Sequence, residues 1–372
     1  MIGALAWATA ALAAIPAATT LANLAVFRTP PPPSSDLPLV SVILPARNEA
    51  SAIEPCLAAL SASTGAEIEI IVVDDASTDD TAARVLAAAR ADRRIRLHTA
   101  APLPPGWAGK MHACAEGARQ ARGGILLFLD CDVRVEPHAV AAMAASVHRS
   151  GVALASFFPQ QHTPTPGEAL LIPLIHVVLM GWLPIWLARR FRHPAFGAGC
   201  GQAIAADAAA YRQAGGHRAI AASWHDGLHL PRAFRRAGLA TDIHDGAKLA
   251  TCRMYRGLGE TWRGLAKNAR DGMATPVALP IWTLLLGGGM LAPFAVLPLA
   301  WARLPAEAAT WALTLATAAL VLARVLVAIR FRQRPLAVLL WPAGIAALLA
   351  LQWRVLLRPP RTLAWRGRTH AA

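Results

Sequence analysis

Hydrophobic residues form long uninterrupted blocks at both ends of this 372-residue chain and short blocks separated by polar residues in its middle. The first block runs from residue 3 to residue 27 without a charged side chain, and three more lie near 276–301, 309–329 and 335–353. About 20 consecutive apolar residues suffice for a helix to cross a bilayer. We therefore expect membrane-spanning segments near both termini.

Two of these blocks allow a second interpretation. The first block also has the length of a secretory signal peptide, but it lacks a basic segment before the apolar residues, so we expect an uncleaved anchor. The last block contains Pro342 and Gly344, which permits a hairpin that returns to the same side of the membrane. Hydropathy favours three C-terminal crossings over this hairpin.

Between the terminal blocks, short apolar runs alternate with segments of helical periodicity. The pattern predicts strands at 39–44, 68–73, 95–98 and 125–129, and helices at 50–60, 81–91 and 112–121. Strands that alternate with helices of this length are typical of a doubly wound, mostly parallel sheet. The middle of the chain is therefore predicted to be an α/β domain.

These patterns also predict domain boundaries. The proline-rich stretch from Thr29 to Pro33 indicates an extended linker between the anchor and the α/β domain. An apolar stretch broken by Pro173 and Pro184 is expected to lie on the bilayer surface. The predicted parts are a transmembrane anchor at 1–28, a linker at 29–38, the α/β domain at 39–275 with an interfacial segment at 165–190, transmembrane segments at 276–357, and a basic tail at 358–372.

Acidic residues follow the predicted strands at the points where the strands end. Asp130 and Asp132 follow the strand at 125–129, Asp75 follows the strand at 68–73, and Glu49 follows the strand at 39–44. Paired acids in such positions are often loop starts or helix caps. Because parallel strands bring their carboxyl ends to one edge, where ligands bind, the convergence favours a site for a nucleotide and a divalent cation.

Three further features are candidates for binding or chemistry. Lys110 is one of only three lysines beside 33 arginines, so a compact ammonium facing a phosphate or a base is an alternative to a surface lysine in a turn. Asp226 heads a predicted helix from Leu228 to Arg236, where an acid is either a helix cap or a general base. The glycine-rich stretch at 196–202 suits close approach of the backbone to a ligand.

Charge and cysteine content narrow the class of protein. The formal net charge is +14, and residues 276–372 alone carry +9. Arginines that flank membrane segments attract anionic lipid and set topology, which explains the excess charge without a nucleic-acid partner. The five cysteines show neither a CxxC pair nor metal-ligand spacing, a pattern that fits a reducing cytoplasm.

The motifs together resemble a known family. Residues 39–270 are similar to the GT-A glycosyltransferases of family 2, and most of all to the membrane-anchored branch with diaponeurosporenoate glycosyltransferase-like and hopene-associated enzymes, which act on carotenoid and hopanoid lipids. The similarity rests on the order and spacing of short motifs at 45–49, 74–79, 103–110, 129–132, 211–217 and 254–268. The resemblance implies a GT-A fold, Rossmann-like and mostly parallel, with transmembrane helices at both ends.

The resemblance also implies roles for single residues. Asp132 together with Asp130 matches the Asp-x-Asp pair that binds Mg²⁺ or Mn²⁺ on the donor diphosphate. Asp226 matches the catalytic base, with inversion at the sugar carbon as the consequence. The remaining residues expected to bind the UDP-sugar donor are Pro45, Ala46, Glu49, Asp75 and Lys110.

Two departures from the family pattern bear on the reaction. His225 stands where many members have an acid before the base, and residues 265–270 lack the Gln-x-x-Arg-Trp motif of the polymer synthases. The sequence therefore predicts transfer of one sugar to a lipid acceptor of carotenoid or hopanoid type. The alternatives are a polyprenyl phosphate acceptor and a membrane scaffold without turnover, although such a scaffold would have no need for Asp75, Asp130, Asp132 and Asp226 together.

The expected location follows from the same features. We expect a multi-pass protein of the bacterial inner membrane whose catalytic domain lies in the cytoplasm. Its expected partners are the nucleotide-sugar, the lipid acceptor and the bilayer, with no nucleic acid.

Overall fold

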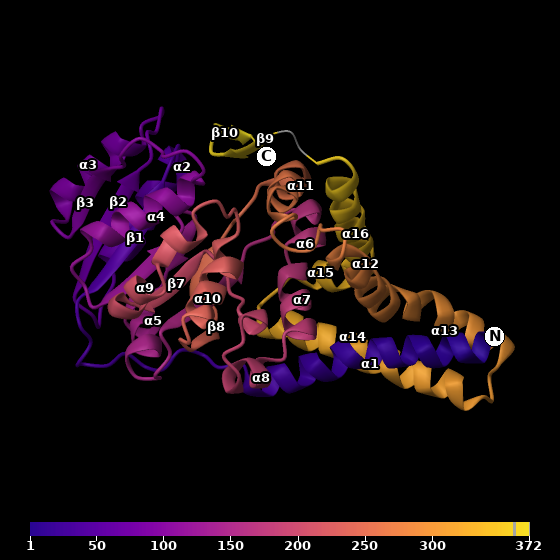
Figure 1. Cartoon of the computed structure of the whole chain (residues 1–372). Coiled ribbons are helices and arrows are strands. Elements are labelled where there is room, and N and C mark those ends of the chain that lie inside the picture. Colours follow the sequence, from indigo (N-terminus) through magenta and orange to yellow (C-terminus); the bar gives the residue numbers. More distant parts are fainter. Residues whose placement is uncertain (360–361, 372) are drawn as a thin grey trace. The chain divides into compact units, whose positions relative to one another are not determined.

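A computed structural model describes residues 1–359 and 362–371 (Figure 1). These residues form two compact units. The sheet unit comprises residues 27–160, 187–253 and 362–371, and the helical unit comprises 1–26, 161–186 and 254–359. The domain boundaries predicted from the sequence stay a prediction.

The sheet unit contains one eight-stranded mixed sheet, in the order β3-β2-β1-β4-β7-β6-β8-β5. The strands β1 to β4 are parallel, whereas β7 runs antiparallel to both β4 and β6, and β5 runs antiparallel to β8. The strands are β1 Val40–Ala46, β2 Ile68–Asp74, β3 Ile95–Thr99, β4 Ile125–Leu129, β5 Val133–Val135, β6 Leu154–Gln161, β7 Ala203–Asp207 and β8 Thr241–Cys252.

Helices connect these strands, and the order predicted from the sequence is confirmed (Figure 1). The largest difference in a boundary concerns the helix expected at 112–121, which is α4 and begins at Gly109, so that Lys110 lies on its first turn and not in the preceding loop. The helices of the sheet unit are α2 Ala50–Ser61, α3 Thr81–Ala91, α4 Gly109–Gln120, α5 Ala139–His148, α9 Ala208–Gln213 and α10 Asp226–Arg236, with short 3₁₀ turns at Pro194–Phe196 and Gly216–Ile220.

The central strands of the sheet are buried on both faces. Every residue of β1, β2 and β4 is buried, as expected for strands that are covered on both faces. Val40 of β1 lies opposite Ile68 of β2 and Ile125 of β4, so the three strands are in register. Parallel pairing then brings the polar segments that follow β1, β2 and β4 to one edge of the sheet.

The helical unit contains the remaining helices. Three of its helices are long and apolar enough to cross a membrane, judged by length and composition: α1 at Ile2–Val26, the continuous helix Ala278–Arg303, and α14 at Ala308–Arg330. The continuous helix has a π-helical stretch at Thr283–Leu291. The other helices are α6 Pro166–Leu171, α7 Leu174–Trp182, α11 Gly257–Asn268, α15 Pro335–Leu339 and α16 Trp341–Leu357, and α8 Ile185–Arg190 spans the boundary of the two units.

The C-terminal apolar blocks form two helices of spanning length in the described chain, not the three that hydropathy favoured. The last block is divided into α15 and the 17-residue α16, and Pro342 lies in the first turn of α16. A proline in that position begins a helix because it has no N–H to leave unpaired. Membrane association is indicated by the three long helices, whereas the crossing pattern and the interfacial position of 165–190 stay predictions.

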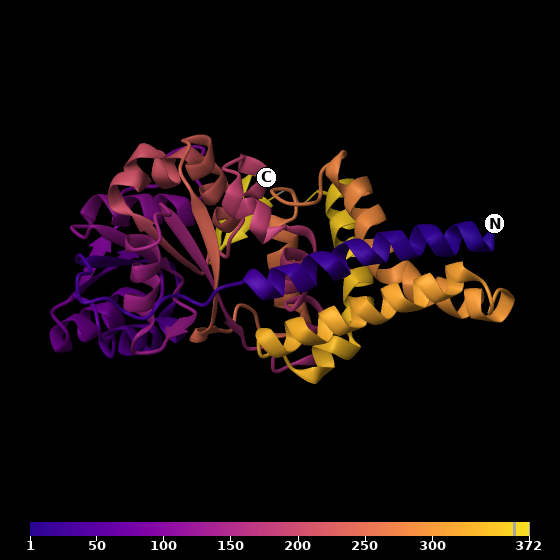
Figure 2. The same ribbon diagram turned by 90° about the horizontal axis from the view of Figure 1, so that it is seen from below.

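Helices α1 and α14 run side by side within the helical unit (Figures 1 and 2). A buried polar residue, Asn23, joins α1 to the segment that follows α7. Its Nδ2 donates to the carbonyl oxygens of Met180 and Leu183, each at 2.7 Å, and its Oδ1 accepts from the Ile185 N–H at 2.9 Å. The side-chain amide is thus well satisfied, which offsets the cost of its burial.

Candidate functional site

The segments that follow β1 and β2 are joined by hydrogen bonds at the edge of the sheet. The Asp75 N–H donates to the Ala46 carbonyl oxygen at 2.8 Å, and the Arg47 guanidinium donates to the backbone oxygens of Asp75 and Ala76. Asn48 and Ala76 have φ angles of 51° and 53°, in the left-handed region that non-glycine residues rarely adopt. Backbone strain of this kind concentrates at functional sites.

Lys110 joins two of the predicted site residues. Its Nζ lies 2.6 Å from Asp130 Oδ1 and 2.9 Å from Asp226 Oδ2, and it donates to the Gly201 carbonyl oxygen at 3.1 Å. Burial disfavours the ammonium, but the two carboxylates outweigh this effect and hold the pKa of Lys110 well above its ordinary value. The structure therefore brings together Lys110, Asp130 and Asp226, which are far apart in the sequence.

Asp226 lies on the first turn of α10 and not at its N-cap position, which His225 occupies without a side-chain hydrogen bond to the helix. The Oδ1 of Asp226 accepts from the Gly227 N–H at 2.8 Å. Burial raises the pKa of Asp226, but the Lys110 charge and hydrogen bond outweigh this effect, with smaller contributions from His217 and His225. The pKa is lowered as a result, so the side chain is a carboxylate at neutral pH.

The glycine-rich stretch at 196–202 packs closely against Ser156 and against the start of α10. A Cβ added to Gly201 would lie 1.9 Å from Asp226 Oδ1, and one added to Gly199 would lie 2.7 Å from the Ser156 side chain. Gly227, at the start of α10, would meet the Gly201 N–H at 2.6 Å if it carried a Cβ. The glycines thus allow α10 to approach closely enough to place Asp226 beside Lys110.

Asp132 has the features of a metal ligand. Its Oδ1 is buried and accepts no hydrogen bond from the part of the chain that the structure describes. Burial, followed by the neighbouring charge of Asp130, raises the pKa of Asp132 to about 6. The described residues contain no cluster of three or more His, Cys, Asp or Glu that would hold a metal alone. Two carboxylates without further protein ligands fit Mg²⁺ or Mn²⁺ that completes its shell with phosphate oxygens and water.

Two predicted binding residues meet a segment that the sequence analysis treated only as a basic tail. Residues 362–371 form an antiparallel hairpin of β9 Thr362–Trp365 and β10 Arg368–Ala371. Arg368 Nη1 lies 2.8 Å and 2.7 Å from the two carboxylate oxygens of Asp75, and Arg366 Nε lies 2.7 Å from Glu49 Oε1. No local sequence pattern predicts these contacts, because each arginine lies some 300 residues from its acid along the chain.

The other predicted residues at this edge have backbone roles. Pro45 accepts a hydrogen bond from the Cys131 thiol at 3.5 Å through its carbonyl oxygen, which joins the end of β1 to the Asp-x-Asp segment. Ala46 is the last residue of β1 and lies opposite Asp74. Through its carbonyl oxygen, Pro45 thus holds the segment of Asp130 and Asp132, and Ala46 holds Asp75.

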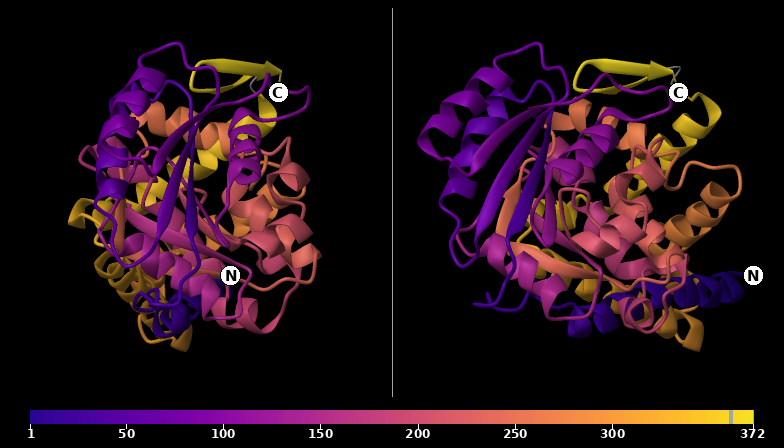
Figure 3. Two further views of the ribbon diagram at one scale, coloured as in Figure 1. Left: turned by 90° about the vertical axis from the view of Figure 1, so that its left-hand side faces the viewer. Right: turned by 60° about the vertical axis from the view of Figure 1, so that its left-hand side comes forward.

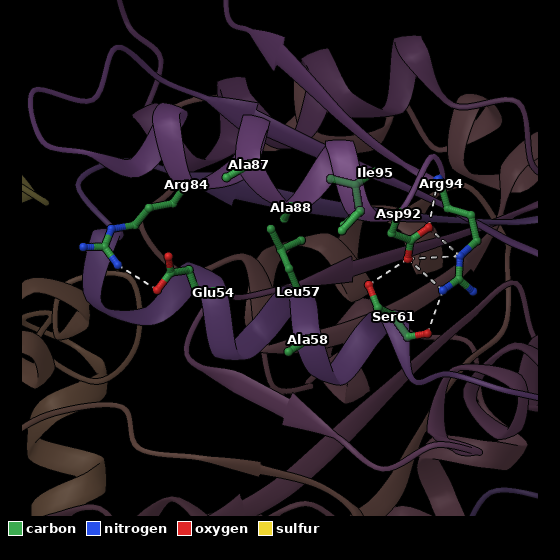
Figure 4. A pocket seen from close by; sticks show the side chains of 11 residues that line it. Glu54, Leu57, Ala58, Ser61, Arg84, Ala87, Ala88, Asp92, Arg94 and Ile95 are labelled. Atoms are coloured by element: carbon green, nitrogen blue, oxygen red, sulfur yellow. Dashed lines mark hydrogen bonds and ion pairs between the residues drawn. The ribbon is translucent and has the colours of Figure 1, made fainter.

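A surface pocket between α2 and α3 is lined by other residues than this site (Figure 4). Its charged residues pair with one another: Glu54 contacts Arg84 at 2.7 Å, and Asp92 contacts Arg94 at 2.8 Å. The described residues that line it include none of the predicted site residues. Because its charges are already paired, we assign no ligand to this pocket.

Comparisons with known proteins find similarity to glycosyltransferases over part of the chain. Residues 41–200 match the family Glycosyl transferase family 2. The 4,4'-diaponeurosporenoate glycosyltransferase of Staphylococcus haemolyticus is 31% identical over 222 residues, which cover 58% of this chain and 56% of that protein. The glucosyl-3-phosphoglycerate synthase of Mycobacterium tuberculosis is 36% identical over 100 residues, 27% of this chain and 30% of that protein. The matched regions therefore cover little more than half of the first relative and less than a third of the second.

A solved structure supports the fold over nearly the whole chain. The mannosyltransferase from Pyrobaculum calidifontis, in complex with GDP-Man and Mn²⁺, superposes with a TM-score of 0.57 at 20% identity and covers 96% of this chain and 99% of that one. At this level of identity the likeness concerns the fold. Residues 41–200 thus match glycosyltransferase family 2, and the described chain has an α/β fold of the GT-A type, as its motifs predicted.

Proposed function

We propose that this protein is a membrane-bound, inverting glycosyltransferase that moves one sugar from a nucleotide-sugar, a UDP-sugar in the first instance, to a lipid acceptor of carotenoid or hopanoid type. The observation that carries the proposal is the contact of Lys110 with both Asp130 and Asp226. It supports the proposal because Asp226, the proposed base, and Asp130, a proposed ligand of the metal, contact the same lysine. Donor and acceptor can therefore meet at one point of the sheet edge.

The donor is proposed to bind along the segments that follow β1, β2 and β4. Glu49 and Asp75, at the ends of β1 and β2, would accept hydrogen bonds from the nucleoside, with Pro45 and Ala46 shaping the turn. Asp132, assisted by Asp130, would hold Mg²⁺ or Mn²⁺, which offsets the negative charge that grows on the leaving diphosphate. Lys110 would supply a further positive charge to the phosphates.

Asp226 is proposed to accept the proton of the acceptor. As an acceptor oxygen attacks the sugar carbon from the side opposite the diphosphate, the carbon–oxygen bond to the diphosphate breaks and the proton passes to a carboxylate oxygen of Asp226. Its lowered pKa keeps this carboxylate deprotonated at neutral pH, which is the form that a base requires. Attack from the opposite side inverts the configuration at the sugar carbon.

The lipid nature of the acceptor rests on two supports. Three helices of the described chain have the length and composition of membrane spans. The relative from Staphylococcus haemolyticus carries a carotenoid glycosyltransferase name and shares 31% identity over 222 residues. A cytoplasmic orientation of the sheet unit at the inner membrane is proposed on the distribution of arginines in the sequence.

The test is release of the nucleotide by detergent-solubilised protein. A panel of UDP-sugars and GDP-mannose is offered with Mn²⁺ or with EDTA, in the presence and absence of extracted membrane lipid. We expect release that needs the metal and rises with lipid, and the panel identifies the donor. Folded protein that neither releases nor binds any of these nucleotides would refute the donor site.

Variants of one acid separate the proposed acceptors. Asp226→Asn is expected to lower the turnover number by about 10²- to 10⁴-fold, since it removes the base but keeps the shape of the side chain. Asp80→Asn, an exposed acid before α3, serves as the matched control. Because a phosphate acceptor is already ionised, full activity of Asp226→Asn would shift the assignment to a polyprenyl phosphate acceptor.

A further inference from the structure

The hairpin of β9 and β10 lies at the same edge of the sheet as the proposed donor site (Figure 3). It contacts the segment that follows β1 at two points, because Asn48 Nδ2 donates to the Arg366 carbonyl oxygen at 3.0 Å and Arg366 pairs with Glu49. It contacts the segment that follows β2 through Arg368 and Asp75. The four residues Trp365 to Arg368 therefore meet both acids that we assign to the nucleoside.

Arg368 forms the most buried of these contacts. Its Nη1 reaches both carboxylate oxygens of Asp75, whose side chain is only 2% exposed. Burial raises the pKa of Asp75, and the Arg368 charge opposes this rise. The guanidinium thus offsets part of the cost of burying this acid at the edge of the sheet.

Arg366 is the more open of the two arginines that meet these acids. Its side chain is 43% exposed while its Nε contacts Glu49, so part of the guanidinium faces solvent. A guanidinium in this place suits the planar, bidentate recognition of a phosphate.

Trp365 brings the hairpin against the start of α4. A Cβ added to Gly109 would lie 2.6 Å from the Trp365 ring and 3.0 Å from Asp75 Oδ2, so only glycine leaves room for this contact. Gly109 directly precedes Lys110. The hairpin therefore spans the segments after β1 and β2 and the first turn of α4, which together carry three of the proposed donor-binding residues, Glu49, Asp75 and Lys110.

We propose that Arg366 and Arg368 bind the diphosphate of the nucleotide-sugar, and that the hairpin completes the donor site. The inference rests on the proposed function. Without a donor, Glu49 and Asp75 are the counter-ions of the two guanidinium groups. When a donor binds, these acids take hydrogen bonds from the nucleoside, and the guanidinium groups turn to the phosphate oxygens, which they can pair with at least as well.

The test compares nucleotide binding by the full-length, detergent-solubilised wild type and by the Arg366→Gln/Arg368→Gln double variant. Isothermal titration with UDP and with GDP, each with Mn²⁺, measures the dissociation constant. We expect the double variant to bind the diphosphate that the wild type prefers about tenfold more weakly or worse, as expected for the loss of charge-assisted hydrogen bonds. Arg90→Gln, an exposed arginine at the end of α3, is the matched control and should bind as the wild type does.

A second readout separates phosphate binding from a merely structural role. The preference for the diphosphate over the corresponding monophosphate, UMP or GMP, should fall in the double variant, because the arginines contact the phosphates and not the nucleoside. Arg366→Lys/Arg368→Lys keeps the charges and should lie between the wild type and the double glutamine variant. Melting temperatures of all variants verify that they are folded.

The outcomes discriminate between the possible roles of the hairpin. Binding that is unchanged or tighter in the double glutamine variant would overturn the inference, and tighter binding would show that the arginines instead compete with the donor for Asp75 and Glu49. If the wild type binds neither nucleotide, the proposed function fails and this inference fails with it. Equal binding by wild type and variant overturns the inference alone.

Discussion

Replacement of Lys110 by methionine tests the electrostatics of the site. Lys110 Nζ lies 2.6 Å from Asp130 and 2.9 Å from Asp226, and all three side chains are largely buried. Methionine keeps the length of the aliphatic stem and removes the charge. The Lys110→Met variant therefore leaves two buried carboxylates near each other without the cation between them.

The size of the effect follows from these distances. At an effective dielectric constant of about 20, each contact supplies on the order of 6 kcal/mol of direct attraction, most of which offsets the desolvation of the charges. Removal of one member of a buried ion pair costs about 3–5 kcal/mol because the remaining charge stays buried. In a domain of this size, that loss corresponds to a fall in melting temperature of about 10 °C.

The assay is thermal unfolding of the detergent-solubilised protein in EDTA, followed by tryptophan fluorescence. Lys248→Met, which removes an exposed lysine on β8, is the matched control and should melt as the wild type does. Addition of Asp226→Asn to Lys110→Met should recover part of the loss, since it removes one of the two uncompensated charges. A Lys110→Met variant that melts within about 2 °C of the wild type would refute the ion-pair reasoning.

Three further predictions follow from the packing and the proposed chemistry. Gly201→Ala should lower the turnover number at least about tenfold, because the added Cβ would displace Asp226. Gly259→Ala is the control and should keep the wild-type rate, because a Cβ there would lie no nearer than 3.5 Å to the Arg263 side chain. Equal rates of the two variants would contradict the placement of Asp226. Asn23→Ala should destabilise the helical unit by about 2–3 kcal/mol, because three buried backbone groups lose their partner, and an unchanged melting temperature would contradict this. EDTA should abolish nucleotide release and excess Mn²⁺ should restore it, so full release in EDTA would exclude the proposed metal site.

The local elements were predictable because they depend on short stretches of sequence. The buried strands at β1, β2 and β4 are uninterrupted apolar runs, and the helices between them show helical periodicity. The acids were predictable as candidates because each follows a strand whose direction fixes the edge at which it ends. The family motifs then supplied roles for single residues.

The errors arise where a boundary or a length depends on neighbours. Helix α4 begins at Gly109 and not at residue 112, and the Trp365 ring packs against this start. The third C-terminal apolar block was expected as one segment, but the structure divides it into α15 and the 17-residue α16, and whether this block crosses the membrane stays a prediction. A hydropathy profile reports only apolar content and does not show where a helix ends.

The sequence by itself determined the α/β order, the likeness to glycosyltransferase family 2 and the identity of the acids at the sheet edge, because periodicity and motifs are local properties of the chain. Only the tertiary structure decided which of these residues touch. It placed Lys110 between Asp130 and Asp226, and it brought Arg368 to Asp75 across 293 residues. Contacts of this kind depend on strand order and on close approach at glycines, which a linear pattern of residues does not encode.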